Sequence, residues 1–301
     1  MTSAAVIPVR NRPSLIATAI ASVQEQTLPL DEIIVVDDGS TDSTPEVVDQ
    51  LSRSDRRIQL VRLPVSGGAA AARNIGIKTA RSRWICFLDS DDIWMPEKHQ
   101  RQSKKLSDFP DAIASFTGIR YRWPNGEEAN ILAPTNITLS RLRRVNYLST
   151  TTTAMVRRDV LENVAGFDAS LPSCQDWDLW IKLKKVGEFA IVREPLVIFN
   201  QTEPVRISVN KAKVLAGHCQ VFERALEDID DASERREIEA YHQFRLAEIY
   251  LHDLREPMAA FLLALKSMFG GPTIGALRLL LSATKAALIK RPSQPSGGPR
   301  L

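Results

Sequence analysis

The stretch Glu32-Ile33-Ile34-Val35-Val36-Asp37-Asp38 is an uninterrupted β-branched run that ends in two carboxylates. Such a run is typical of a strand buried on both faces of a sheet. Similar short runs lie before and after it, and segments with apolar residues at helical spacing lie between them. The other expected strands are Ala4–Val9, Ile58–Arg62 and Trp84–Leu88, and the expected helices are Pro13–Gln26, one starting at Thr44, and Gly68–Ala80. This alternation predicts an α/β fold with a mostly parallel sheet and helices on both faces.

The chain after residue 110 has a different pattern. Residues 111–200 mix strand and helix signals: we expect strands at Ala112–Ile119, Thr151–Val156, Phe189–Val192 and Leu196–Asn200, and a helix at Asp176–Lys185. Beyond Lys211 the pattern is helical. The expected helices there are Lys211–Ile229, Ser233–Leu254, Pro257–Phe269 and Thr273–Ile289, with a disordered Pro-, Ser- and Gly-rich tail at 291–301.

The composition excludes several classes of protein. Apolar residues make up 44% of the 301 residues and charged residues 25%, which is ordinary for a globular protein, and the net charge of +3 is too small to favour nucleic acid as a partner. Cys86, Cys174 and Cys219 lack metal-ligand or disulfide-framework spacing and fit a reducing compartment. The N-terminal residues show no signal-peptide pattern, and no apolar run is long enough to span a membrane, so we expect a cytoplasmic protein.

Two acidic clusters follow expected strands, Asp37-Asp38 and Asp89-Ser90-Asp91-Asp92. Ligands of open α/β sheets bind beyond the carboxyl ends of the strands. Carboxylates about 4 Å apart repel by roughly 4 kcal/mol at an effective dielectric of 20, so the second cluster needs a cation or open solvent. Oxygen ligands favour Mg²⁺ or Mn²⁺ shared with phosphate. The alternative is a solvated turn whose aspartates cap the next helix.

A third segment favours an anionic ligand at the same edge. Gly67-Gly68-Ala69-Ala70-Ala71-Ala72-Arg73-Asn74 supplies a helix N-terminus and a guanidinium, both of which attract anions. It matches neither a Walker A loop nor a dinucleotide fingerprint.

These segments resemble the motifs of glycosyltransferase family 2, whose members have the GT-A nucleotide-sugar fold and invert the sugar's anomeric configuration. The resemblance covers about residues 1–205. The matching stretches, in order, are Ile7–Pro13, Val35–Asp42, Gly68–Gly76, Phe87–Trp94 and Gly166-Phe167-Asp168 leading to Gln175–Trp180. It implies a GT-A domain over 1–205, with a nucleotide-sugar half of about 1–110 and an acceptor half of about 111–205, then a helical C-terminal extension over 206–290.

The resemblance assigns one group of residues to the nucleotide of the donor. Pro8 and Val9 lie along the base, Asp38 resembles the carboxylate that hydrogen-bonds the base edge, and Arg73 lines the same pocket. Position 10, often an aromatic residue that stacks on uracil, is Arg10, whose guanidinium plane can also stack. The resemblance favours UDP, with dTDP and GDP as alternatives.

A second group is assigned to the diphosphate and to the chemistry. Asp89 and Ser90 lie near the ribose and diphosphate, and Asp91 resembles the D-x-D ligand of Mn²⁺ or Mg²⁺. Asp176 aligns with the catalytic base, although the preceding residue is Gln175 where the family often has Glu.

The implied activity is metal-dependent, inverting transfer of a sugar from a nucleotide sugar to a hydroxyl of a glycan or lipid-linked acceptor, in cell-surface polysaccharide synthesis. One alternative is a catalytically silent binding protein, which would have no need of a base such as Asp176. The other is a sugar nucleotidyltransferase, whose Gly-rich basic signature is missing from Arg10-Asn11-Arg12-Pro13.

Several residues are expected to have structural roles. We expect Trp84, Trp177 and Trp180 in the core, while Trp94 and Trp177 are near enough to the acidic motifs to contact sugar. The histidines show no metal-ligand spacing and are expected at the surface. They are His99, His218, His242 and His252. Cys174 is expected to be a packing residue, and Asp178 a helix N-terminal charge and not a second base.

The C-terminal segment Arg278–Arg300 has five basic residues and no acidic one, and Leu279, Leu280, Leu281, Ala287 and Leu288 lie among them. This pattern suggests peripheral contact with an anionic membrane surface. The alternative is a helix packed on the catalytic domain with a solvated basic face.

Overall fold

The computed structural model describes residues 1–200, 210–269 and 273–289, and the chain divides into two compact units. The first comprises Met1–Leu142 and Asn146–Val221, and the second Arg143–Val145 and Phe222–Leu301. Each unit is described by itself.

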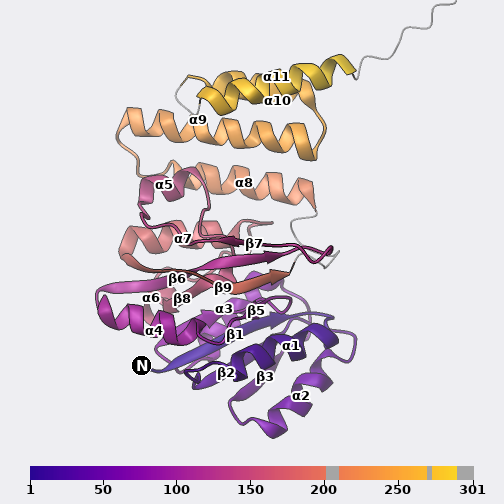
Figure 1. Ribbon diagram of the computed structural model, residues 1–301, viewed down its shortest axis with the longest axis vertical. Coiled ribbons are helices and arrows are strands. Elements are labelled where there is room, and N and C mark those ends of the chain that lie inside the picture. Colours follow the sequence, from indigo (N-terminus) through magenta and orange to yellow (C-terminus); the bar gives the residue numbers. More distant parts are fainter. Residues whose placement is uncertain (201–209, 270–272, 290–301) are drawn as a thin grey trace, which may run out of the picture. The chain divides into compact units, whose positions relative to one another are not determined.

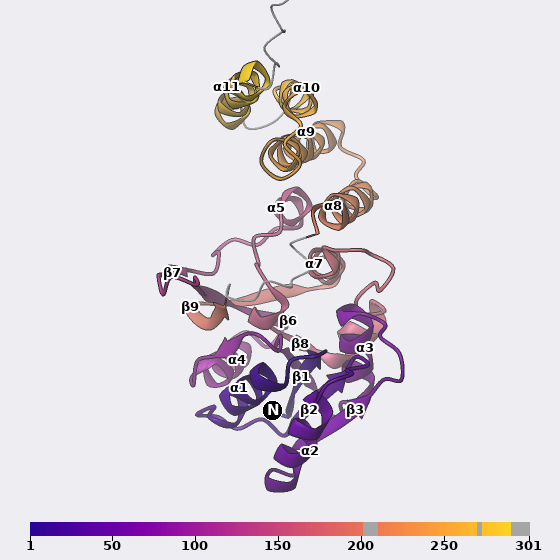
Figure 2. The same cartoon turned by 90° about the vertical axis from the view of Figure 1, so that its right-hand side faces the viewer.

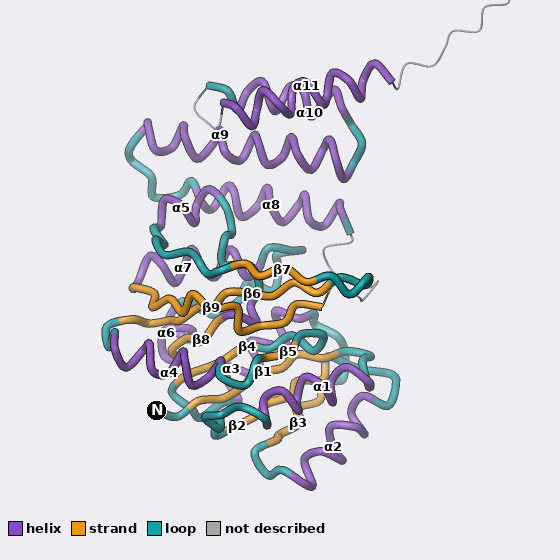
Figure 3. The backbone as a smooth tube through the Cα atoms, viewed as in Figure 1, coloured by secondary structure: helices purple, strands orange, loops and turns teal. Residues whose placement is uncertain are grey.

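The first unit is built on one mixed sheet whose strand order is β3-β2-β1-β4-β8-β6-β9-β5, with β7 paired to β6. The four N-terminal strands are parallel, and the remaining pairings are antiparallel except for β6 with β9. Figures 1 and 3 show the strands stacked as one layer. The strands are β1 Ser3–Val9, β2 Glu32–Asp37, β3 Ile58–Arg62, β4 Trp84–Phe87, β5 Ile93–Trp94, β6 Ala112–Arg122, β7 Glu128–Ile131, β8 Ala154–Arg157 and β9 Glu188–Asn200.

Helices cover both faces of the parallel half, as the sequence predicts. Alternate residues of β1, namely Ala5, Ile7 and Val9, join one buried cluster with α1 and α4, whereas Val6 faces α3. Figure 2 shows α1 and α4 on one side of these strands and α3 on the other. The helices of this unit are α1 Pro13–Gln24, α2 Thr44–Ser54, α3 Ala69–Thr79, α4 Lys98–Asp108, α6 Arg158–Asn163 and α7 Gln175–Val186, with a 3₁₀ turn η1 at Thr151–Thr153. Helix α5, Leu139–Arg144, belongs to this unit up to Leu142, and its last two residues belong to the second.

The predicted α/β class and parallel strands are confirmed, but the second half of the sheet differs in detail. β9 is one strand of 13 residues and not two short ones. The break expected near Pro195 is a register shift in the pairing with β6, between Thr117 and Gly118. A bulge accommodates the proline, which has no N–H for the ladder, without ending the strand.

The second unit is helical and continues from α8 (Lys211–Ala225), whose residues up to Val221 belong to the first unit. It contains α9 Ala232–Glu248, a π-helical turn η3 Ile249–Asp253, α10 Pro257–Ser267 and α11 Thr273–Ile289. Asp231 caps α9 by accepting hydrogen bonds from the backbone N–H groups of Ser233 and Glu234. Small residues let α9, α10 and α11 pack closely around Ala247, Leu251, Ala260, Ala264, Leu279 and Ala283. The predicted tail at 291–301 lies outside the described residues.

Four tryptophans and two histidines are buried in the structure. Trp84, Trp177 and Trp180 are buried as predicted. Trp94 is also buried, so the structure does not support the sugar contact expected for Trp94 and Trp177. The surface prediction is wrong for two histidines.

His99 and His242 are buried because the fold gives their ring nitrogens fixed partners. His99 Nδ1 donates to the Leu28 carbonyl at 2.7 Å and Nε2 accepts from the Ser3 hydroxyl at 2.8 Å. Burial lowers the pKa of His99. His242 Nε2 donates to the Arg143 carbonyl at 2.7 Å.

Gly76 allows α3 to approach the sheet. A Cβ at this position would lie 2.3 Å from Cγ1 of Val6. We expect Gly76→Ala to lower the unfolding free energy by about 1–2 kcal/mol, because the overpacking cost of about 1–3 kcal/mol exceeds the helix-propensity gain of up to about 1 kcal/mol. Val6→Ala has a cost of its own because Val6 is fully buried, but a denaturation double-mutant cycle should show favourable coupling between the two changes, since the smaller side chain makes room for the new Cβ. A Gly76→Ala protein as stable as the native chain would contradict this close packing.

Candidate active site

The two acidic clusters and the start of α3 meet at one edge of the sheet. β1, β2 and β4 are parallel neighbours, so the segments that follow them emerge side by side. The structure therefore brings Asp38, Arg73 and the Asp89–Asp92 segment together from separate parts of the sequence, as the motifs predict.

The Asp38 carboxylate holds the loop that enters α3. It accepts hydrogen bonds from the backbone N–H groups of Gly67 at 2.7 Å and Gly68 at 3.0 Å, and from the Ser66 hydroxyl at 2.7 Å. Ser66 in turn accepts from the exposed Arg10 guanidinium at 2.8 Å. Asp38 is buried, and in this structure its carboxylate stabilises the loop before α3. Its contact with a nucleotide base stays a prediction.

Pro8 and Val9, the other two residues assigned to the base, end β1. Both are buried and lie in register with Val36 and Asp37 of β2. Their side chains belong to the interior of the sheet, and only the backbone and the following residue, Arg10, lead out to the surface.

Arg73 and Asp89 form the central ion pair of the site. Nη2 of Arg73 lies 2.5 Å from Oδ1 of Asp89, and the guanidinium also lies over the Phe167 ring, 5.4 Å from its centroid. The carboxylate accepts further hydrogen bonds from the hydroxyls of Thr150 and Thr151. Burial acts to raise the pKa of Asp89, but Arg73 and these hydroxyls outweigh it and hold the pKa below its usual value.

Asp91 and Ser90 contact Arg12. The Arg12 guanidinium lies 3.0 Å from the Asp91 carboxylate and donates to the Ser90 hydroxyl at 3.4 Å. The backbone carbonyl of Asp91 accepts from the Asn200 amide at 2.9 Å, which ties this segment to β9. Asp91 keeps 13% of its side chain exposed, so the carboxylate reaches the surface of the site.

The carboxylates of the Asp89–Asp92 segment suit a divalent metal ion that binds few protein ligands. Among the residues that the structure describes, no group of three or more His, Cys, Asp or Glu side chains is arranged to hold a metal. Mg²⁺ and Mn²⁺ in phosphate-handling sites bind through one or two carboxylates and complete their shells with substrate phosphates and water. The Asp91 carboxylate, which is 13% exposed and paired with Arg12, would supply one such ligand.

Asp176 lies in the first turn of α7, after Cys174 in the left-handed conformation (φ 60°). Its Oδ2 accepts from the Asn146 amide at 2.9 Å, and the side chain is half-buried. Burial raises the pKa of Asp176, and the Trp177 backbone N–H, the positive charge of Arg73 and Asn146 offset part of this increase. The next acidic residue, Asp178, is buried and paired with Lys182 at 3.1 Å, which fits a structural charge.

Several residues of this site could not be assigned from the sequence. Arg12 lies in one of the family motifs, but its pairing with Asp91 was not predicted. Thr151–Thr153, the start of a predicted strand, instead form η1 and bond the acidic segment. Thr152 accepts from the Asp89 N–H and donates to Asp92. Asn146 lies in a loop with no motif, so only the fold could identify it.

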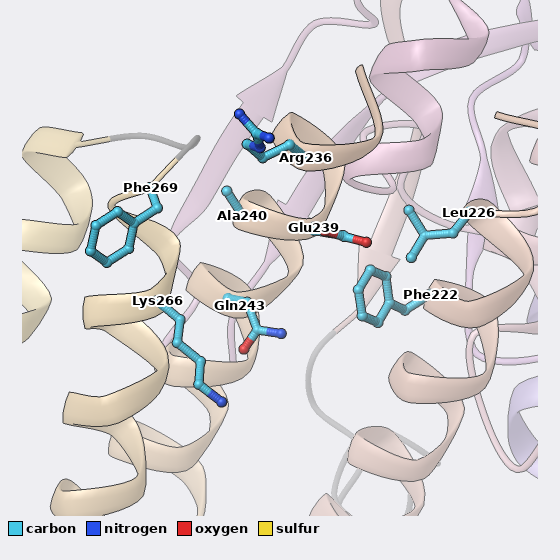
Figure 4. Close-up of a pocket in the computed structure, with 8 residues that line it drawn as sticks. All are labelled: Phe222, Leu226, Arg236, Glu239, Ala240, Gln243, Lys266 and Phe269. Carbon is cyan, nitrogen blue, oxygen red and sulfur yellow. The ribbon is translucent and has the colours of Figure 1, made fainter. Parts of the chain in front are cut away.

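The described residues also line two surface hollows. One, of about 380 Å³, follows β2 and β3 and is lined by Asp37, Gly39, Ser40, Thr41, Arg62, Leu63 and Pro64. The other, of about 640 Å³, belongs to the second unit and is lined by Phe222, Leu226, Arg236, Glu239, Ala240, Gln243, Lys266 and Phe269 (Figure 4). None of the predicted site residues lines either hollow.

Comparison with known proteins identifies the family. The model of the family described as "Glycosyl transferase family 2" matches residues 4–165, more than half of the chain. The chain belongs to glycosyl transferase family 2. The matched segment contains every predicted donor-side residue, Pro8 to Asp91, whereas Asp176 follows it.

Two curated glycosyltransferases are similar to this chain in sequence. The putative teichuronic acid biosynthesis glycosyltransferase TuaG of Bacillus subtilis is 32% identical over 184 residues, which cover 60% of this chain and 71% of that protein. WfgD of Escherichia coli, a UDP-Glc:alpha-D-GlcNAc-diphosphoundecaprenol beta-1,3-glucosyltransferase, is 34% identical over 220 residues, which cover 72% of this chain and 83% of that protein.

Solved structures confirm the GT-A type fold. Staphylococcus aureus TarS 1–349 in complex with UDP-GlcNAc matches with a TM-score of 0.69 at 18% identity, covering 95% of this chain and 89% of that one. The mannosyltransferase PcManGT of Pyrobaculum calidifontis, in complex with GDP-Man and Mn²⁺, matches with a TM-score of 0.59 at 22% identity, covering 96% and 81%.

The Arg73–Asp89 pair makes a pH-dependent contribution to stability. Arg73→Leu should lower the unfolding free energy by about 3–5 kcal/mol near pH 7, because it leaves a mostly buried carboxylate without its cation. Asp89 has a lowered pKa in the folded protein, so this contribution is present above the unfolded-state value of about 3.9 and is lost as the pH falls through the lowered pKa. Urea denaturation near pH 7 and near pH 3 measures both effects.

The matched control is Arg101→Leu, which removes an exposed pair with Glu97 and should cost less than about 1 kcal/mol at either pH. Equal losses for the two arginine variants would refute the special role of Arg73.

Proposed function

We propose that this protein is an inverting glycosyltransferase that moves a sugar from a UDP-sugar to a hydroxyl of a glycan or lipid-linked acceptor. The observation that carries the proposal is that Arg73 acts on two carboxylates of different character. It pairs directly with Asp89, and its charge also reaches Asp176. The charge of Arg73 therefore acts to lower the pKa of both carboxylates, Asp89 and Asp176.

Asp176 is the proposed general base. An acceptor hydroxyl is a weak nucleophile near pH 7, so a carboxylate must take its proton as the oxygen attacks the anomeric carbon. The new bond forms from the acceptor oxygen to that carbon, the bond from the carbon to the diphosphate oxygen breaks, and the configuration inverts in this one displacement. The raised pKa makes Asp176 a stronger proton acceptor than an exposed aspartate, and Asn146 fixes the direction of its carboxylate.

The departing diphosphate gains negative charge, which the site must stabilise. Arg12 and Arg73 supply two guanidinium groups at this rim. Asp91 would hold the Mn²⁺ or Mg²⁺, which neutralises phosphate charge as a Lewis acid when it is bound.

The donor and the acceptor class are proposed from the relatives. TarS was solved with UDP-GlcNAc, and the name of WfgD gives a UDP-Glc donor and a diphosphoundecaprenol-linked acceptor. TuaG is named for teichuronic acid biosynthesis. These names favour UDP and a role in surface polysaccharide assembly, whereas the GDP-Man complex of PcManGT keeps GDP as the alternative base. A silent binding protein is disfavoured, because it would gain nothing from a half-buried carboxylate with a raised pKa.

Asp176→Asn should separate catalysis from binding and stability. We expect a loss of about 10²–10⁴-fold in kcat, because the neutral amide cannot accept the proton. The melting temperature near pH 7 should not fall, because the raised pKa means that the ionised group opposes folding. Turnover and melting are measured together, with Asp108→Asn on the exposed end of α4 as the control. Full turnover by the Asp176→Asn protein would refute the base assignment.

The donor site is tested by melting with UDP, dTDP and GDP, with and without Mn²⁺. UDP with Mn²⁺ at about 100 times its Kd should raise the melting temperature by roughly 5–10 °C, because it binds only the native protein. Asp91→Asn should remove the part of the shift that depends on Mn²⁺, whereas Asp49→Asn on the exposed surface of α2 should leave it unchanged. No shift with any of the three nucleotides would contradict the transferase proposal.

A further inference from the structure

Helices α10 and α11 both expose a stripe of large apolar side chains. In each stripe the residues are three or four positions apart, as on one side of a helix. The stripe of α10 consists of Met258, Leu262, Leu265 and Phe269, the last of which follows the final turn, and that of α11 consists of Ile274, Leu277 and Leu281. We call these seven residues the α10–α11 apolar face. Phe269 is 78% exposed, Ile274 71% and Leu281 66%. Single exposed apolar residues are common in soluble proteins, but ordered stripes of them indicate an interaction surface.

The apolar face has no packing task inside the second unit. The other side of each helix already fills the helical cluster, through Ala260 and Ala264 of α10 and through Leu279 and Ala283 of α11. Leu279 was expected on a membrane-facing surface, and the structure corrects this because Leu279 is buried in that cluster. The exposed stripe of α11 consists of Ile274, Leu277 and Leu281 instead.

The two helices that carry this face bear charges of one sign. From Pro257 to Leu301 the sequence contains no Asp or Glu, and the basic residues of α10 and α11 are Lys266, Arg278 and Lys285, whereas Glu239 of α9 lines the hollow that Lys266 and Phe269 also line. Lys266, Arg278 and Lys285 are exposed on the two helices, and Lys266 lies close to Phe269 at the edge of the hollow in Figure 4. Apolar stripes flanked by Lys and Arg are typical of helices that lie in a membrane interface.

We propose that the α10–α11 apolar face docks on an anionic lipid surface, with the apolar side chains in the headgroup–acyl boundary and the basic side chains on lipid phosphates. The same charge argues against a second copy as the occupant, because two such faces would bring like charges together. Within the described part of the chain no helix is long and apolar enough to cross a bilayer, so the contact is peripheral. This surface is independent of the transferase proposal, since lipid binding needs neither donor nor acceptor.

The test is flotation of the full chain with vesicles of phosphatidylcholine, alone or mixed with phosphatidylglycerol. The protein should float with the anionic vesicles at about 50 mM salt and much less at about 500 mM, because screening weakens the basic contacts. Phosphatidylcholine alone should bind weakly. Inorganic phosphate at the same concentration as the lipid phosphate should not compete, which distinguishes a lipid surface from a free phosphate site.

A pair of variants assigns the binding to this face. Ile274→Asp with Leu281→Asp should weaken binding to anionic vesicles by about tenfold or more, because it places charge in the apolar stripe. Leu132→Asp with Val186→Asp makes the same change at two exposed apolar positions of the first unit and should bind as the native chain does. The UDP melting shift of both proteins checks that the first unit remains folded.

Three outcomes would overturn the proposal. One is a native chain that does not float with anionic vesicles, and another is equal binding by the two double variants. The third is light scattering that shows a native dimer which Ile274→Asp with Leu281→Asp converts to a monomer, since a second copy would then cover the face. Each can occur while the UDP shift and sugar transfer persist, so failure here is distinct from failure of the transferase proposal.

Discussion

The ion pair between Arg73 and Asp89 is the interaction on which the site depends. It joins the first turns of α3 to the end of β4, and the threonine hydroxyls of η1 bond the same carboxylate. A buried pair of this kind is costly to break, because either partner alone would be a desolvated charge. The segments that carry Arg73 and Asp89 are thus held together, and the charge of Arg73 also limits how far burial raises the pKa of Asp176.

This pair forms only because α3 lies close to the sheet. Gly76 removes the side chain that would meet Val6, and Asp38 fixes the loop before α3 through the backbone of Gly67 and Gly68. Helix α3 can lie close to the sheet because Gly76 has no side chain. At this position Arg73 of the helix reaches the carboxylate of Asp89, which follows β4.

Much of the first unit could be predicted from local pattern. Strands such as Glu32–Asp37 and helices such as α3 follow directly from buried apolar runs, helical spacing and the segments between them. The two-residue strand β5 and strand β7 have too few residues for a period to be recognised. Burial of His99 was also unpredictable, because it depends on a hydroxyl 96 residues away and a carbonyl 71 residues away.

The sequence by itself determined the family, the parallel strand–helix half and the identity of the acidic motifs, because these are properties of contiguous residues. Only the tertiary structure decided what each carboxylate contacts. Asp38 holds a loop, Asp89 meets Arg73, Asp91 meets Arg12, and Asp176 is bonded by Asn146 from a loop without a motif. The physical reason is that hydrogen bonds and desolvation act over a few ångströms in space, and sequence separation carries no record of that distance.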